Sequence, residues 1–380
     1  TLTRWDLSGL SLRDTQLDDS NLSEVTFEGS DLTGASFSGR VNLVDADLTD
    51  AIINDTFLRA TTFKGLTEGQ VASTASYKAR SLVDIDFSFN DFTGWDLSGQ
   101  DFTGGRLDDT TFINADLSDA VAPNMLFGIA RFENTTATGA DFRGGAFAGV
   151  RSFDNVELTG ANLTDAVFLA TSVPAELISF ADLRGSSGLS VVGEARNTIP
   201  STGRVPVIDV RAGETLRLWD READGDSRGD PVPVIDIVVT DRFEVQADAT
   251  LRVVLEDDEW GSLIRFDNGG GPPVDAFIDG QLELAFGRGI TPLDLIAFDG
   301  VSFRLFDWSN ADLDGIFASI SYDGVGLFET DALLTTGFVT YRIPAPASFS
   351  VLVVVSACTL RRRSRDHAAG VTPGPLAGHT

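Results

Sequence analysis

The sequence predicts an all-β protein in which a β-solenoid is followed by a second β-rich module and a short C-terminal apolar helix. Three observations support this prediction. Large apolar residues recur every five positions over the first half of the chain. The period stops after Gly185, where short β-rich runs separated by Gly, Pro and Asp take over. An apolar run near the C-terminus is followed at once by arginines.

The five-residue period excludes both an amphipathic helix and a flat strand. Every fifth side chain drifts around a helix, and in a strand it alternates between the two faces. A constant inward direction is obtained when each five residues form one side of a polygon, as in a solenoid. Thirty-two such units fall into four runs, Leu7 to Phe37, Leu43 to Phe63, Phe87 to Phe147, and Phe153 to Leu183. The period shifts by one residue at Val41 and again near Val150, and we call these shifts one-residue slips.

Each position of the unit has its own requirement. The central Leu or Phe fills the axis, and the residue two places before it must be small because it shares that interior. Asp or Asn directly before the centre, such as Asn162, is expected to face solvent, and Ser or Thr followed by Gly or Asp closes the unit. The predicted core of the last run includes Phe153, Leu158, Leu163, Phe168 and Leu183.

These units resemble the pentapeptide-repeat family, whose motif reads A-(D/N)-L-x-x. The motif stands here as ADLTD, ADLSD, ADFRG, ANLTD and ADLRG, and the resemblance covers about half the chain. It implies a right-handed quadrilateral β-helix with four units per turn. On that basis 32 units would form about 8 coils and a rod about 40 Å long.

The predicted organisation has six segments. Thr67 and Gln70 form a capping-box pattern, so a short helix is expected to start near Glu68. This interruption and the following NDFTGWDLSGQDFTG are similar to pentapeptide-repeat surface proteins of planctomycete-like bacteria. The β-rich module is expected to be either an irregular β-helix or a sandwich. The segments are a first solenoid stack (1–65), a helical insertion or cap (66–83), a second stack (84–185), the β-rich module (186–343), a sorting and anchor segment (344–365) and a disordered tail (366–380).

The charge and the residue inventory exclude several functions. The net charge is −29, and residues 1–185 and 186–345 each hold 28 acidic and 12 basic side chains. Such a surface does not attract nucleic acid phosphates. Cys358 is the only cysteine, and both histidines, His367 and His379, lie in the polar tail. No disulfide framework, histidine-based catalytic triad or zinc site can be built, so we expect no enzyme and no cofactor.

Two acidic segments are candidate chemical sites. Asp220, Glu222, Asp224 and Asp226 alternate before a Gly-containing turn and could bind calcium, but Pro231 stands where an EF-hand loop has its distal Glu. A solvated acidic loop is therefore favoured over a calcium site. The acids at 256–259 beside Trp260 suggest a glycosidase carboxylate pair, but consecutive acids alternate faces in a strand. No catalytic residue is assigned.

The C-terminal segment predicts a location. Residues 347–360 form an apolar run that is short for a membrane-spanning helix, and Arg361, Arg362 and Arg363 follow directly. A basic cluster beside an apolar run fits the positive-inside pattern. Together with the start at Pro344, Ala345 and Pro346, the segment resembles the PEP-CTERM sorting signal, although Ala345 replaces the usual Glu and a polar tail follows. The resemblance implies an exosortase-like processing enzyme as a partner and contact with the membrane.

The leading hypothesis is a non-enzymatic exported structural or interaction protein. It would be an acidic β-solenoid scaffold sorted to the cell envelope or the extracellular matrix, where it meets a partner not yet identified. The alternative is a cytosolic DNA mimic that binds a topoisomerase, as the family resemblance implies for acidic, duplex-shaped members. The alternative predicts acidity concentrated on the solenoid. A polysaccharide-degrading enzyme that uses only carboxylates has no positive support in the sequence.

Overall fold

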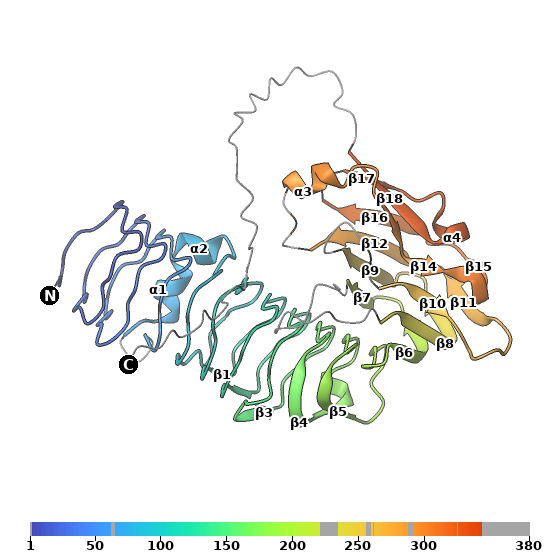
Figure 1. The fold of residues 1–380 in the computed structure, drawn as a ribbon, viewed down its shortest axis with the longest axis horizontal. Helices are drawn as coiled ribbons and strands as arrows, with labels where there is room; N and C mark the ends of the chain where they lie inside the picture. The colour runs from blue at the N-terminus through green and yellow to red at the C-terminus, as the bar shows by residue number, and fades with distance from the viewer. Residues whose placement is uncertain are drawn as a thin grey trace, which may run out of the picture. The chain divides into compact units, whose positions relative to one another are not determined.

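The described residues between 2 and 185 wind into stacked coils, and those between Ile199 and Ile343 form a second β module (Figure 1). The structure is a computed structural model that describes residues 2–61, 65–220, 235–255, 260, 262–287, 290, 292–324 and 326–343. The apolar core of the coils includes buried residues from Leu17 to Leu183. A separate core runs from Ile199 to Tyr341.

A constant offset between bridged residues defines the coil. Asp6 bridges Thr26, and Asp101 bridges Val121; both pairs are parallel, and in each the partners stand four units apart in the sequence. Four five-residue units therefore complete one coil. The offset grows by one residue between Asn21 and Asn42 and between the strand residues Arg131 and Ser152. The one-residue slips predicted near Val41 and Val150 are therefore confirmed.

A β-turn closes most units. The N–H three residues after the central residue donates to the carbonyl of that centre, as from Ala161 to Leu158 at 3.0 Å. The residue two places after the centre has a positive φ, +69° at Gly160 and +58° at Asp165. A positive φ at this third position of a turn is the mark of type II, which favours Gly and tolerates Asp and Asn. This requirement explains why Gly or Asp closes most units.

The Asp or Asn before each centre also has a local role. Its side-chain oxygen accepts the N–H two residues on, as in Asp31 with Thr33 at 3.0 Å and Asn162 with Thr164 at 3.1 Å. This Asx turn is why the position prefers Asp and Asn. The prediction that this position faces solvent is wrong for Asp141, Asn162 and Asp182, which are all buried. Asn162 is fully buried and donates Nδ2–H to Asp141 Oδ1 at 2.9 Å.

The core of the solenoid is a set of stacked ladders. Leu158, Leu163, Phe168 and Leu183 are buried, and Phe153 is half-buried at the edge of this core. Phe147 stacks almost parallel on Phe168, with ring centroids 4.7 Å apart. Only a few coil segments are long enough to count as strands or turns of helix: β1 (Thr111–Ile113), β2 (Arg131–Glu133), β3 (Ser152–Asp154), β4 (Val167–Pro174), η2 (Ala175–Leu177) and β5 (Ser187–Val192).

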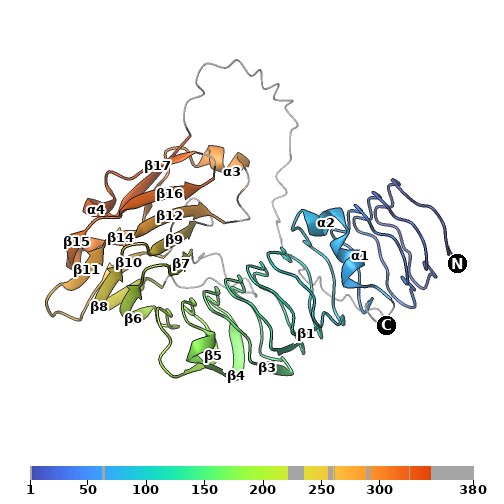
Figure 2. The ribbon, with the colours of Figure 1, turned by 180° about the vertical axis from the view of Figure 1, so that it is seen from behind.

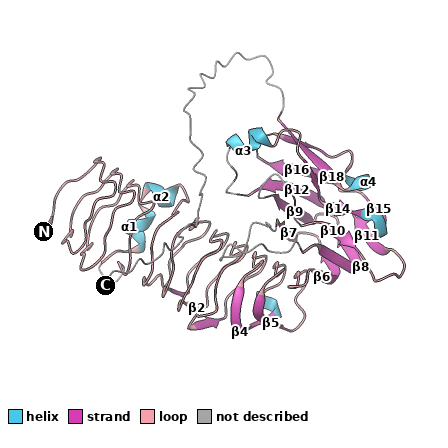
Figure 3. Cartoon of the chain, in the orientation of Figure 1, coloured by secondary structure: helices cyan, strands magenta, loops and turns pink. Residues whose placement is uncertain are grey.

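Two short helices, α1 (Glu68–Ala72) and α2 (Ala75–Lys78), interrupt the coils (Figures 1 and 3). The predicted capping box is confirmed, because Thr67 caps α1 and exchanges hydrogen bonds with Gln70. Gln70 Nε2 also donates to the carbonyls of Leu43 and Ala46, which ties α1 to the preceding coil. The repeat resumes at Leu82, fully buried, one unit earlier than predicted. The predicted centre Phe63 lies outside the described residues.

The second module is an irregular parallel β-helix, one of the two predicted alternatives (Figure 2). Strands β6, β8, β11 and β15 stack in parallel, and β7, β9, β12 and β16 form a second parallel stack. Register partners in the second stack are Thr215 with Thr250, Thr250 with Gln281, and Gln281 with Ser319. These offsets differ from turn to turn, which is why the sequence shows no period here. Their bounds are β6 (Arg204–Val210), β7 (Thr215–Trp219), β8 (Ile237–Val245), β9 (Thr250–Leu255), β11 (Val274–Ile278), β12 (Gln281–Phe286), β15 (Ala311–Gly315) and β16 (Ser319–Asp323).

The remaining elements complete this module. Strand β10 pairs in parallel with β8 and β14, and β18 pairs antiparallel with β13 and β17. No helix in the described part of the chain is both long and apolar enough to span a membrane. The predicted C-terminal helix and sorting residues, all beyond Ile343, lie outside the described residues. The bounds are β10 (Ile264–Phe266), α3 (Pro292–Ala297), β13 (Ser302–Arg304), β14 (Phe306–Asp307), η3 (Trp308–Asn310), β17 (Leu327–Glu329), α4 (Leu333–Thr336) and β18 (Phe338–Arg342).

A pair of glycine substitutions tests the turn requirement. Gly144 and Gly160 have similar positive φ values, +63° and +69°, but a Cβ on Gly144 would overlap Asn124 Oδ1 of the preceding coil, whereas a Cβ on Gly160 meets nothing within 4 Å. We expect Gly160→Ala to lower the free energy of unfolding by about 1 kcal/mol, the cost of the left-handed conformation. Gly144→Ala should cost a further ~0.5–1 kcal/mol, because the Asn124 side chain must leave its rotamer to relieve the overlap. Equal losses in chemical denaturation would contradict this account.

Candidate functional site

A buried ion pair joins the last coil to the second module. Asp182 and Arg184 come from the unit ADLRG, on either side of the core residue Leu183, and both side chains are fully buried. Arg184 Nη2 lies 2.7 Å from Asp182 Oδ2, and Nε lies 3.0 Å from Oδ1. The same guanidinium donates to the carbonyls of Trp219 at 2.9 Å and Ile235 at 2.9 Å. The cation is therefore paired, and its donors bind the backbone at β7 and just before β8.

A second polar contact lies further along the solenoid. Arg217 on β7 donates Nη1–H to Asp119 Oδ1 at 3.0 Å and to the Gly139 carbonyl at 3.1 Å. The guanidinium also lies over the Trp219 ring, 5.2 Å from its centroid. A Cβ on Gly139 would lie 2.7 Å from Arg217 Nη1, so glycine at this position allows the approach.

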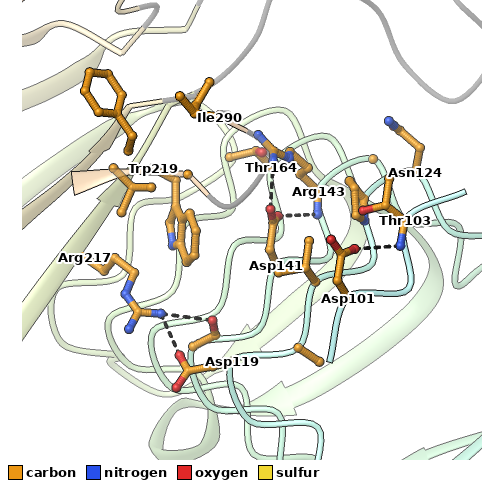
Figure 4. Close-up of a pocket in the computed structure, with 18 of the residues that line it drawn as sticks. Asp101, Thr103, Asp119, Asn124, Asp141, Arg143, Thr164, Arg217, Trp219 and Ile290 are labelled. Atoms are coloured by element: carbon orange, nitrogen blue, oxygen red, sulfur yellow. Dashed lines mark hydrogen bonds and ion pairs between the residues drawn. The ribbon is translucent and has the colours of Figure 1, made fainter. Parts of the chain in front are cut away.

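A cleft of about 870 Å³ lies between the solenoid and the ends of β7, β9 and β12 (Figure 4). Its solenoid wall is the side of the coils that carries Asp101, Thr103, Asp141, Arg143 and Thr164. This is the same side that carries Asp182 and Arg184 in the last coil. The wall is therefore a continuous ladder that is covered at Asp182 and open toward Asp101. The residues that line the cleft are Val83, Asp84, Asp101, Thr103, Asp119, Ala120, Val121, Pro123, Asn124, Gly139, Asp141, Arg143, Gly144, Thr164, Asp165, Arg217, Trp219, Arg252, Val254, Phe286, Gly287 and Ile290.

The cleft is rich in carboxylates. Its described lining holds five aspartates and three arginines. Each arginine contacts a carboxylate: Arg143 Nη2 lies 3.0 Å from Asp141, Arg217 contacts Asp119, and Arg252 Nη1 lies 2.6 Å from Glu283. The described lining therefore keeps an excess of negative charge and favours a cationic or hydroxyl-rich ligand over an anion.

Asp141 is the most deeply buried carboxylate of the cleft. Burial raises its pKa above the ordinary value, although Arg143, the N–H of Arg143 and Asn162 all stabilise the ionised form. Trp219 contributes another unusual group. Its Nε1–H is buried and has no hydrogen-bond partner in the part of the chain that the structure describes. The cleft wall therefore combines a buried carboxylate with a desolvated indole N–H.

Of the candidate residues predicted from the acidic segments, the structure describes only Asp220. Asp220 is buried directly after Trp219, and its N–H donates to the Val254 carbonyl at 3.1 Å. Glu222, Asp224 and Asp226 lie outside the described residues, as do the acids at 256–259. Over residues 2–343 with the gaps given above, no group of three or more His, Cys, Asp or Glu side chains is placed to hold a metal ion.

Sequence reasoning missed the cleft, although a signal was present. The units ADFRG and ADLRG place an Asp-x-Arg pair on the same side of the solenoid, two coils apart. An arginine two residues after the aspartate is unusual among the repeats of this chain, which mostly have Ser or Thr there. The arginine in place of Ser or Thr marks the side of the solenoid that faces the second module. Its partners on β7 could not be identified, because they lie far away in the sequence.

A double-mutant cycle tests the junction. Arg184→Met leaves Asp182 as a buried, unpaired charge and should lower the free energy of unfolding by roughly 3–5 kcal/mol. Combining Arg184→Met with Asp182→Leu removes both charges and should cost clearly less than the single change. Arg4→Met, in the exposed pair Arg4–Glu24, is the control and should leave stability unchanged within error. Equal effects of the single and double variants in denaturant titrations would contradict the role given to this pair.

Comparison with known proteins identifies the repeats. Residues 2–39 and 81–119 match the family model for pentapeptide repeats, in eight copies. No curated protein matches the chain. A trypsin-treated form of QnrB1, a plasmid-mediated fluoroquinolone resistance protein, is 14% identical over 48% of this chain and 89% of its own, with a TM-score of 0.26.

Two solved cyanobacterial structures show the same weak likeness. HetL of Nostoc sp. strain PCC 7120 is 18% identical over 50% of this chain and 91% of its own, with a TM-score of 0.20. Rfr23 of Cyanothece 51142 is 20% identical over 31% and 63%, with a TM-score of 0.12. These scores are too low to relate the chains in detail. Residues 2–39 and 81–119 of the solenoid are nevertheless pentapeptide repeats of the kind that the family model describes.

Proposed function

We propose that this protein is a non-enzymatic scaffold of the cell envelope or extracellular matrix. The acidic β-solenoid would carry the second β-helix on its last coil and offer the cleft between them to a partner. The observation behind this proposal is the junction: the fully buried Arg184 pairs with Asp182 and also donates to the Trp219 and Ile235 carbonyls. Such a joint holds the cleft walls in fixed positions. We further propose that the coils are right-handed and quadrilateral, as the family resemblance implies.

The proposed location rests on the sequence beyond Ile343. The Pro344–Pro346 start, the apolar run and the arginines at 361–363 match the order of a PEP-CTERM-like signal. An exosortase-like enzyme would process this segment, and the membrane would hold it until then. A strongly acidic surface keeps an exposed protein soluble and gives it no attraction to nucleic acid. The scaffold needs no cofactor, and calcium at Asp220, Glu222, Asp224 and Asp226 is the weaker proposal for that segment.

Cell fractionation tests the proposed location. The full chain, placed behind a cleavable export signal in a bacterium that contains an exosortase, should be retained in the envelope. A variant with Arg361→Ala, Arg362→Ala and Arg363→Ala should be found mainly in the soluble exported fraction. It lacks the positive charges that hold the end of the apolar run on the cytoplasmic side of the membrane. The matched control replaces the same arginines with lysine and should be retained. The same distribution for all three proteins would contradict the sorting role.

The second candidate is the cytosolic DNA mimic that binds a topoisomerase. Its support is the charge of the solenoid: 16 net negative charges on residues 1–185 over about 40 Å give roughly 0.4 per Å, compared with about 0.6 per Å for duplex DNA. The second module carries the same excess, so the acidity is not concentrated on the solenoid, which favours the scaffold. In a supercoiling assay with purified topoisomerase we expect no inhibition. Inhibition that weakens steeply with salt would instead support the mimic.

A further inference from the structure

The lining of the cleft places hydrogen-bond donors beside acceptors. Within the coils, Arg143 Nη2 lies 3.0 Å from Asp141 Oδ2. At the contact with β7, Arg217 Nη1 lies 3.0 Å from Asp119 Oδ1 (Figure 4). A guanidinium only donates and a carboxylate only accepts, so each pair offers both functions at one place. A hydroxyl group also donates and accepts, and two neighbouring hydroxyls of one ligand match such a pair.

Apolar surface separates these polar groups. Asp101 bridges Val121, and Val121 bridges Asp141, so a half-buried valine lies between two carboxylates that stand two coils, or about 10 Å, apart. From the second module, Phe286 and Ile290 add further apolar surface to the lining. The cleft therefore alternates charged hydrogen-bonding groups with small apolar areas. A sugar ring has the same character, because its hydroxyls project from the rim and its C–H bonds cover the faces.

The charges in the lining disfavour the other classes of ligand. The five aspartates outnumber the three arginines, so an anion is repelled. In the part of the chain that the structure describes, no cluster of acids, His or Cys is placed to hold a metal ion. An organic cation or a basic peptide would meet the arginines. The Trp219 ring cannot form an open aromatic cage for an ammonium group, because it is only 7% exposed and already carries the Arg217 guanidinium. A neutral ligand with many hydroxyls fits all of these constraints.

We propose that the cleft binds a neutral oligosaccharide or the end of a neutral polysaccharide. Hydroxyl groups bind the Asp–Arg pairs, and the C–H faces of the rings contact Val121 and Phe286. The cleft volume of about 870 Å³ is near the upper end of the range for small-molecule sites, about 300–1,000 Å³, so it accommodates more than one sugar ring. Trp219 also lines the cleft, and its buried Nε1–H, which has no partner among the described residues, is a donor for a sugar oxygen. This inference rests on the proposed scaffold function, in which the cleft receives a partner, but not on the proposed location.

Isothermal titration calorimetry of the purified full chain tests the class of ligand. The probes are three neutral hexasaccharides (cellohexaose, laminarihexaose and mannohexaose), the anionic hexagalacturonate and the cationic peptide hexalysine. At least one neutral hexasaccharide should bind, and its dissociation constant should change less than about twofold between low and high salt, because an uncharged ligand is not subject to screening. Hexagalacturonate and hexalysine should bind more weakly or not at all. Tighter binding of either charged probe, or no binding of any neutral probe at millimolar concentration, would overturn the proposal.

Two pairs of variants place the binding in the cleft. Asp101 and Asp91 stand in the same local motif, DFTG, and accept the same Asx-turn hydrogen bond, at 2.9 and 3.0 Å, but of the two only Asp101 lines the cleft. Asp101→Ala should therefore weaken binding at least about tenfold, the loss expected for a hydrogen bond to a charged group, whereas Asp91→Ala should bind like the wild type.

The second pair blocks the cleft and leaves its carboxylates in place. Val121→Arg places a long side chain between Asp101 and Asp141 and should abolish binding. Leu126→Arg is the matched control, because Leu126 holds the same position in the next unit, is 52% exposed and is not part of the lining, and it should bind normally. Equal affinities within either pair would overturn the proposal. Because these titrations use purified protein, their failure would leave the envelope retention measured by fractionation unaffected, and a failure of retention would leave the titrations unaffected.

Discussion

The solenoid depends on a single backbone constraint, a left-handed residue every five positions. The turn that it closes redirects the chain, and four such turns bring bridged residues together after four repeat units. Only then do bridged residues such as Asp101 and Val121 meet in register. The chemistry of the repeat follows from this constraint: Gly, Asp or Asn supplies the left-handed position, and Asp or Asn before the centre binds the turn through its side chain. The apolar ladder is possible because each turn directs the central Leu or Phe of the next unit into the interior.

The junction shows how one repeat unit can serve a second purpose. In most units with Asp before the centre, the residue after the centre is a small Ser or Thr. In ADLRG it is Arg184, which pairs with the Asx-turn residue Asp182 and reaches two carbonyls of the second module. An apolar side chain could not satisfy those carbonyls, and an unpaired arginine could not be buried. The local motif is thus unchanged, but its polar groups hold two cores together and create one end of the cleft.

The parts of the fold set by short-range rules were predictable, and those set by distant contacts were not. The period, the two slips and the capping box of Thr67 and Gln70 all depend on residues within a few positions of one another, and the structure confirms them. The burial of Asn162 does not follow from its motif, because the same motif at Asp31 stays partly exposed. The parallel stacking of the second module is equally hidden, since its register offsets vary. The cleft joins residues as far apart as Asp119 and Arg217, and only the Asp-x-Arg units hinted at it.

The helical interruption shows that the solenoid tolerates added chain. Phe57 bridges Asp86 although α1 and α2 both lie between them in the sequence, so this coil is longer than a regular one, yet the stacking continues on both sides of the helices. A coil is therefore defined by where its corners meet their neighbours and not by its length. A segment such as α1 and α2 can therefore be inserted between two units while the bridges on both sides are kept. The sequence of an inserted segment can thus change without altering the turns and bridges that hold the coils together.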